Sequence, residues 1–124
     1  MKYTGPEDCG NSPKNLLLAD WERSLAHGDW DEVAAVLDDD VVLEVTAPGG
    51  LETSRGSAAA VERLRSVRGD ASHAVVDSAI SHGKEGAAWG SWTVSGVEVP
   101  FAHVFRFTSA AGKQLAWIRI VNGV

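Results

Sequence analysis

Cysteine is almost absent from this chain, because Cys9 is the only one among its 124 residues. A single thiol cannot form an internal disulfide, and Cys9 stands in a polar segment without a base to activate it, so we expect no catalytic thiol. Long apolar runs are missing as well. The first dozen residues contain none, which argues against a secretory signal or a membrane span and makes the cytoplasm the simplest location.

Basic residues are outnumbered, since 11 lysines and arginines stand against 17 aspartates and glutamates and give a formal net charge of −6. They are also scattered along the chain, so the protein should repel nucleic acid on average. Histidine pairs with the spacing of a zinc site are missing too. The acidic run Asp38-Asp39-Asp40 is interpreted as a solvated turn, since three consecutive side chains cannot converge on one metal ion.

The remaining composition is typical of a globular protein, with 44% hydrophobic and 23% charged residues. A chain of this length buries roughly two-thirds of the surface that it exposes when unfolded, so it can build a sizeable core without disulfides. We expect residues 13–124 to form a single domain after a flexible tail over residues 1–12.

The first helix is predicted from its start signal and its apolar stripe. Ser12 can cap free amides and Pro13 suits the first helical position, so the helix runs from there to about His27. Its apolar residues recur at helical spacing and need a cover. They are Leu17, Leu18, Trp21 and Leu25, whereas Asp20, Glu22 and Arg23 fall outside this stripe.

Two further helices and a short strand follow. Asp29 and Glu32 have the spacing of a capping box, which predicts a second helix. Residues 41–45 indicate a short strand, residues 47–50 a turn, and a third helix is expected from about Ser57 to just before Gly69.

From Ser72 onward the hydrophobic pattern has a period of two. It predicts four long strands at about residues 72–82, 86–95, 98–108 and 113–122, joined as hairpins at glycines. Helical stripes that close over one face of a curved antiparallel sheet make an α+β domain.

The strand at residues 98–108 contains the most informative residue. Alternation places His103 on one face with Phe101, Phe105 and Phe107. An imidazole has an unperturbed pKa of about 6.5, so it can act as acid, base or hydrogen-bond partner near neutral pH if a cavity lets a ligand reach it. The alternative is a buried histidine satisfied by a backbone carbonyl or water.

Two stretches resemble a known family. Residues 21–31 resemble its first helix and Gly-Asp turn, and Phe105-Arg106-Phe107 leads through Gly112-Lys113 to Trp117. Together with the order of elements, they resemble nuclear transport factor 2 and its SnoaL-like and ketosteroid isomerase-like relatives. The resemblance spans nearly the whole chain and implies a cone-shaped fold, with three N-terminal helices on a curved mixed or antiparallel sheet.

The resemblance also implies where catalytic residues would stand. Trp21 falls at the position of the isomerases' tyrosine, Val45 at that of the proton-shuttling aspartate and His103 at that of the oxyanion-binding aspartate. Asn122 falls where many members end the last strand with aspartate. All of these identities differ, and Val45 cannot accept a proton, so steroid isomerisation by the usual route is not expected.

The same positions predict one ligand cavity. We expect His103, Trp21, Val45 and Trp117 to line it, together with Phe101 and Phe105. Arg119 has the parity of Trp117, so it either binds a ligand carboxylate or enolate or pairs with Asp77 or Glu98.

Trp89 and Trp92 have opposite parity on one strand, so one of them should face the cavity and the other the outer surface of the sheet. An exposed tryptophan there favours a homodimer through the outer face.

We therefore expect a domain that binds a small, apolar, oxygen-bearing ligand. As an enzyme it would be an isomerase, cyclase or dehydratase acting by proton transfer on an apolar cyclic carbonyl compound. His103 would be the catalytic acid and base, the Trp21 indole would steady the oxygen, and no cofactor would be needed. The alternative is a non-catalytic ligand-binding or protein-interaction module of the same fold.

Overall fold

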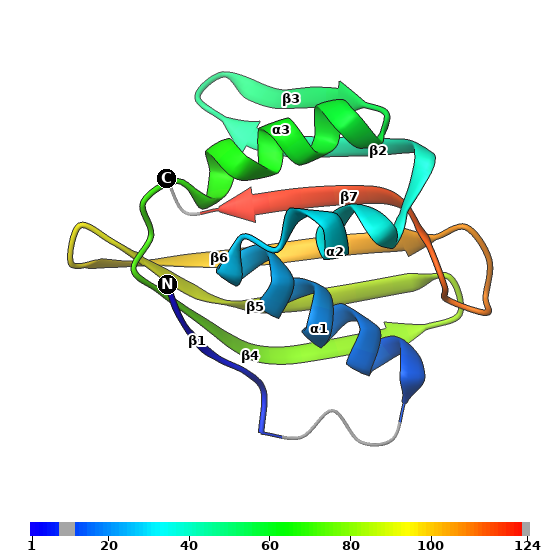
Figure 1. Ribbon diagram of the computed structural model, residues 1–124, viewed down its shortest axis with the longest axis horizontal. Helices are drawn as coiled ribbons and strands as arrows, with labels where there is room; N and C mark the ends of the chain where they lie inside the picture. The colour runs from blue at the N-terminus through cyan, green and yellow to red at the C-terminus, as the bar shows by residue number, and fades with distance from the viewer. Residues whose placement is uncertain (8–11, 123–124) are drawn as a thin grey trace.

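The computed structural model describes residues 1–7 and 12–122, and within them three helices lie on one face of a single curved sheet (Figure 1). The helices are α1 (Pro13–His27), α2 (Trp30–Ala35) and α3 (Ser57–Arg68). The strands are β1 (Lys2–Thr4), β2 (Leu37–Ala47), β3 (Gly50–Arg55), β4 (His73–His82), β5 (Glu85–Val94), β6 (Val97–Phe107) and β7 (Leu115–Asn122). The predicted α+β class, the three helices and the long strands of the second half are confirmed.

Helix α1 begins and ends as its sequence signals predict. The Ser12 hydroxyl accepts a hydrogen bond from the backbone N–H of Asn15 at 3.3 Å, and Pro13 occupies the first turn. Gly28 ends the helix with φ of 73°, a left-handed conformation that glycine adopts without steric cost. The helix lies across β4 and β5 (Figure 1).

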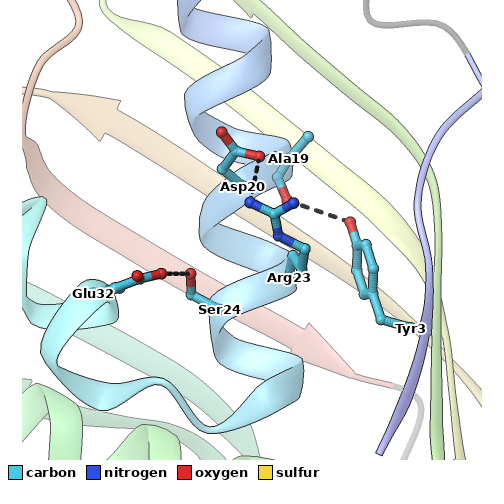
Figure 2. Close-up of polar contacts among 6 residues, drawn as sticks. All are labelled: Tyr3, Ala19, Asp20, Arg23, Ser24 and Glu32. Carbon is cyan, nitrogen blue, oxygen red and sulfur yellow. Dashed lines mark hydrogen bonds and ion pairs between the residues drawn. The ribbon is translucent and has the colours of Figure 1, made fainter.

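Helix α2 lacks the predicted capping box. Asp29 makes no side-chain cap, and Glu32 instead accepts a hydrogen bond from the Ser24 hydroxyl at 3.1 Å (Figure 2). The partner is on α1, so Glu32 joins the two helices and is not available for its own helix start. A contact between elements has therefore replaced the local one that the spacing suggested.

The sheet runs in the order β1-β4-β5-β6-β7-β2-β3. Strands β4 to β7 form the predicted antiparallel meander, while β2 pairs with β7 in parallel, which makes the sheet mixed. The pairing of β4 with β5 shifts between Val76 and Ser78, and such an irregularity bends a strand. Opposite it, a Cβ on Gly90 would stand 1.8 Å from the Val75 carbonyl oxygen, so this position requires glycine.

Two strands were not predicted. Lys2–Thr4 falls within the expected tail, yet it forms β1, and Tyr3 donates a hydrogen bond from its hydroxyl to the Ala19 carbonyl at 3.3 Å (Figure 2). Gly50–Arg55 forms the edge strand β3 on β2. Its side chains are almost all exposed, so it has no hydrophobic alternation by which a strand is recognised.

The C-terminal end of the chain and one short segment near the N-terminus lie outside the described residues. Cys9, judged not to be a catalytic thiol, lies outside the described residues, as do residues 123–124. Within the described part of the chain, no helix combines the length and the apolar character needed to cross a membrane.

Candidate functional site

His103 lies on the inner face of β6, the face that the helices cover. Its side chain is 1% exposed, and Phe101, Phe105 and Phe107 on the same face are buried as well. The imidazole is stacked at a tilt on Phe101, with ring centroids 4.3 Å apart, and meets Phe105 edge-on at 6.4 Å. The predicted parity of this strand is confirmed.

Glu22 is the residue that the sequence analysis missed. Its carboxylate oxygen Oε1 lies 2.6 Å from His103 Nδ1, and its side chain is also 1% exposed. The pair joins α1 to β6 in the interior. A signal for it was present, because Glu22 is four residues after Leu18 and three before Leu25, two fully buried residues of the same helix face.

The contact with Glu22 decides what the imidazole can do. A carboxylate only accepts hydrogen bonds, so in the neutral imidazole we place the ring proton on Nδ1, which donates to Oε1 and leaves the lone pair on Nε2. Among the described residues Nε2 has no hydrogen-bond partner. A carboxylate that holds one nitrogen while the other stays free is the arrangement by which a general base is oriented.

A cavity of about 190 Å³ lies against His103. It sits where the β5–β6 hairpin, the end of β7 and the last turn of α3 meet. Apart from His103 and Asn122 its walls are apolar. We call this space the His103 cavity; its lining includes Val67, Trp92, Phe101, His103, Ile120 and Asn122. Val94 and Pro100, both exposed, also line it, so it reaches the surface at the hairpin.

Trp21 is buried, but it does not line the His103 cavity. Its indole N–H donates to the Val33 carbonyl on α2 at 3.2 Å, and its ring packs edge-on against Phe105 with centroids 5.5 Å apart. The expectation that this N–H would serve a ligand or His103 is therefore wrong. Trp21 and Phe105 form the core behind the imidazole.

Val45 is 1% exposed on the inner face of β2. It lines a neighbouring hollow rather than the His103 cavity itself. Glu44, the adjacent residue, lies on the opposite face, as strand parity requires. The position that would hold a proton-shuttling aspartate in the resembled isomerases is thus apolar and inward.

Trp117 and Arg119 lie on the other face of the sheet, which corrects their predicted place in the cavity. The pairing of β6 with β7 shifts between Arg106 and Phe107, so Leu115 and Trp117 do not share a face although they are two residues apart. Ile118 and Ile120 are the inward residues.

On the outer face these two side chains gather around Glu44, not around Asp77 or Glu98 as expected. The Trp117 indole N–H and an Arg119 N–H, the latter at 3.1 Å, both donate to Glu44 Oε1. The hydrogen bond from Trp117, and secondarily that from Arg119, lowers the pKa of the Glu44 carboxyl. We call Glu44, Trp117 and Arg119 the outer cluster.

Trp89 and Trp92 face opposite sides, as predicted. Trp92 is 7% exposed and lines the His103 cavity, whereas Trp89 is 39% exposed on the outer face. A homodimer through that face stays a prediction.

Of the predicted ligand-binding set, the structure therefore brings together only His103 and Phe101 at the cavity. Val45 lines the neighbouring hollow, and Trp21 and Phe105 belong to the core behind the imidazole. Trp117 and Arg119 lie on the opposite face of the sheet.

The comparisons with known proteins agree with this architecture. A family model, the SnoaL-like domain, matches residues 18–117. Because this match covers most of the chain, the protein belongs to the SnoaL-like family, within the nuclear transport factor 2-like superfamily that the sequence resembles. No curated protein sequence matches the chain.

Solved structures with the same fold are distant in sequence. An NTF-2 like protein of unknown function from Burkholderia xenovorans LB400 has a TM-score of 0.74 at 16% identity, over 87% of this chain and 80% of its own. A candidate ketosteroid isomerase from Kribbella flavida DSM 17836 has 0.73 at 17%, over 88% and 76%. A candidate SnoaL-like polyketide cyclase from Shewanella denitrificans OS-217 has 0.69 at 10%, over 90% and 91%. Identities this low establish the fold alone.

Proposed function

We propose that this protein is an enzyme that moves a proton beside the carbonyl group of a small, cyclic, largely apolar compound. The observation that supports it is the buried His103, which lines an apolar cavity and whose Nδ1 is held by Glu22. The reaction needs only a base, an acid and a hydrogen-bond donor to the carbonyl oxygen, so we propose no cofactor.

His103 has the catalytic role in this proposal. Nε2 removes a proton from the carbon next to the carbonyl, and the resulting imidazolium returns it at another carbon in an isomerisation or to a leaving hydroxyl in a dehydration. Glu22 is a positioning residue, since it touches the imidazole and would stabilise its cationic form. Such acid–base catalysis contributes roughly 10²–10⁴-fold in rate.

Asn122 can serve the carbonyl oxygen. Phe101 pairs with Asn122 and His103 with Ile120, so the imidazole and the Asn122 side chain are diagonal neighbours on the inner face, about 7–8 Å apart at the backbone. The Asn122 side-chain amide has no partner among the described residues and lines the cavity. Its N–H groups can therefore stabilise negative charge that develops on the substrate oxygen.

The size of the cavity restricts the substrate. An engineered apolar cavity of about 150 Å³ binds benzene, so the 190 Å³ of the His103 cavity suit a single ring. Pockets for larger ligands measure roughly 300–1,000 Å³. The volume therefore favours a monocyclic ketone, enone or lactone over a steroid nucleus.

Proton transfer can be tested without knowing the substrate. Cyclohexanone in D₂O should exchange its protons beside the carbonyl faster with the protein than in buffer, and His103→Gln should reduce this acceleration by about 100-fold or more. His27→Gln is the matched control, because His27 lies at the end of α1 beside Tyr3 and outside the cavity. Deuterium incorporation is followed by ¹H NMR, and thermal melting verifies that each variant is folded.

The second candidate is a binding module without catalysis. The apolar Val45 at the family's proton-shuttle position favours it. If cyclohexanone shifts the NMR signals of cavity residues but its protons exchange no faster than in buffer, the protein is a binding module and the proposal of an enzyme is wrong. Absence of any binding by cyclic ketones, lactones and epoxides would contradict both.

A further inference from the structure

A second hollow lies next to the His103 cavity. This hollow has a volume of about 440 Å³ and is lined by residues of α3, the ends of β2 and β7, and Glu52 of β3. It shares Val67 and Asn122 with the His103 cavity. The two spaces therefore adjoin at these two residues, and we call the second one the Arg63 groove, after the only cation in its lining among the described residues.

Arg63 is held in the groove with donors to spare. Its Nη1 donates to the Ser66 hydroxyl at 3.3 Å, and its Nη2 lies 3.6 Å from a Glu52 oxygen. Its Nε is buried and has no hydrogen-bond partner among the described residues. The contact with Glu52 is long, and the Glu52 side chain is 63% exposed, so water and salt weaken this ion pair.

The Arg63 groove has apolar walls as well as polar ones. Val45, Ala47 and Pro48 line it, and Val67 stands where the two spaces adjoin. Asn122 lies at the same junction, with its backbone N–H bound to the Thr46 hydroxyl and its side-chain amide free among the described residues. A ligand that filled both spaces would thus pass from an apolar ring site, past one amide, to a guanidinium.

We propose that the Arg63 groove is the carboxylate-binding arm of the His103 site, and that its ligands are small acids with an apolar ring. The ring occupies the cavity and the carboxylate contacts Arg63. This inference rests on the proposed function, because that function places the apolar ring of the ligand in the His103 cavity. A guanidinium presents a fork of N–H donors that matches a carboxylate, and the terminal nitrogens of Arg63 use only part of their N–H groups on Ser66 and Glu52.

The chemistry favours a carboxylate over a more highly charged group. The chain has a formal net charge of −6, and Glu52 stands beside Arg63, so a doubly charged phosphate would meet more repulsion than a single carboxylate. A neutral amide gains no charge attraction from Arg63. Preference for the acid over the matched amide is therefore the property to measure.

The experiment compares 3-phenylpropanoate with 3-phenylpropanamide, which differ only in that end group, by NMR titration of the ¹⁵N-labelled protein. The acid should bind at least 10-fold more tightly than the amide. Arg63→Gln should remove this preference and leave the amide unchanged. Arg65→Gln is the matched control, because Arg65 is on the same helix but contacts Trp30 and Glu62 outside the groove.

Glu52→Gln provides a change in the opposite direction. It removes the carboxylate that competes for Arg63, so 3-phenylpropanoate should bind several-fold more tightly to this variant than to the unmodified protein. A variant that gains affinity cannot be explained by poor folding.

Toluene and cyclohexanone separate failure of this inference from failure of the proposed function. If these neutral rings bind in the cavity but acid and amide bind equally, or if Arg63→Gln leaves the preference intact, the carboxylate arm is wrong and the ring site stands. If no neutral ring binds, the ring site itself is wrong.

Discussion

The inner pair of Glu22 and His103 and the outer cluster around Glu44 use similar chemistry in different surroundings. Each has a glutamate that accepts hydrogen bonds from a ring N–H of a strand residue, Nδ1 of His103 on β6 or Nε1 of Trp117 on β7. The inner side chains are 1% exposed, whereas Arg119 and Glu44 are 41% and 18% exposed. Glu22 has one partner beside a cavity, and Glu44 has two partners beside solvent.

The inner pair is the more specialised of the two. Water can replace a lost partner at the outer cluster, so its members stabilise the sheet and lose little when separated. Water cannot do so for Glu22, because a buried group without its partner keeps its full desolvation cost. In the proposed function the pair also serves catalysis, because Glu22 orients the imidazole whose Nε2 acts as the base.

The largest effect is expected from Glu22→Ala. It empties space in the core and leaves the imidazole without a partner, so the free energy of unfolding should fall by about 3–5 kcal/mol. Urea denaturation followed by tryptophan fluorescence measures it. Glu22→Gln, which keeps a hydrogen-bond acceptor, should lose less, and a loss below about 1 kcal/mol for the alanine variant would remove the contrast between the two clusters.

A smaller effect is expected from Glu44→Gln on the outer face. The amide keeps a hydrogen-bond acceptor for Trp117 but loses the charge that attracts Arg119, which is worth about 1 kcal/mol or less at this exposure. The same urea experiment applies. A loss as large as that of Glu22→Ala would show that the two clusters do not differ in the way proposed.

The outer cluster also predicts a pH dependence. The pKa of Glu44 is lowered from its ordinary 4.5, chiefly by the Trp117 hydrogen bond. Its contribution to stability is therefore present above that value and is lost as the pH falls through the lower pKa of the folded protein. Trp117→Phe should bring the pKa of Glu44 back toward its ordinary value.

A ¹³C NMR titration of the Glu44 carboxyl carbon measures this change directly. Trp89→Phe is the control, because Trp89 lies on the outer face of the same sheet but does not donate a hydrogen bond to Glu44. Identical titration curves for Trp117→Phe and the unmodified protein would contradict the assigned cause.

The smallest effect is expected from Arg23→Gln. Its ion pair with Asp20 at 3.1 Å joins two exposed side chains one turn apart on α1 (Figure 2). Such pairs contribute about 0.3–0.5 kcal/mol, and high salt should abolish the difference. A loss of unfolding free energy above about 1 kcal/mol that persists at high salt would contradict the expectation that exposed ion pairs contribute little to the stability of this protein.

The sequence was informative where local signals and tertiary structure agree. Ser12, Pro13 and Gly28 act within one turn of the chain, and the alternation around His103 persists because β6 is regular there. The meander and the family resemblance rest on such signals. They were enough to predict the α+β fold and the inward imidazole.

The rest depended on contacts between elements. A shift in pairing near the start of β7 reversed the parity of Trp117 and Arg119, and no residue type marks such a shift. Glu22 was placed outside the apolar stripe although it shares a helix face with Leu18 and Leu25, and its partner His103 is 81 residues away in the sequence. Arg63 stands out only once α3 lies over β2 and β3.

The position of the proton on the neutral His103 ring decides whether Nε2 can act as a base. A long-range ¹H–¹⁵N spectrum at mildly alkaline pH reports which nitrogen of a neutral imidazole carries the proton. Our account predicts the proton on Nδ1, a free lone pair on Nε2, and a shift of the Nε2 signal when cyclohexanone is added. A proton on Nε2, with Nδ1 bare toward Glu22, would contradict it.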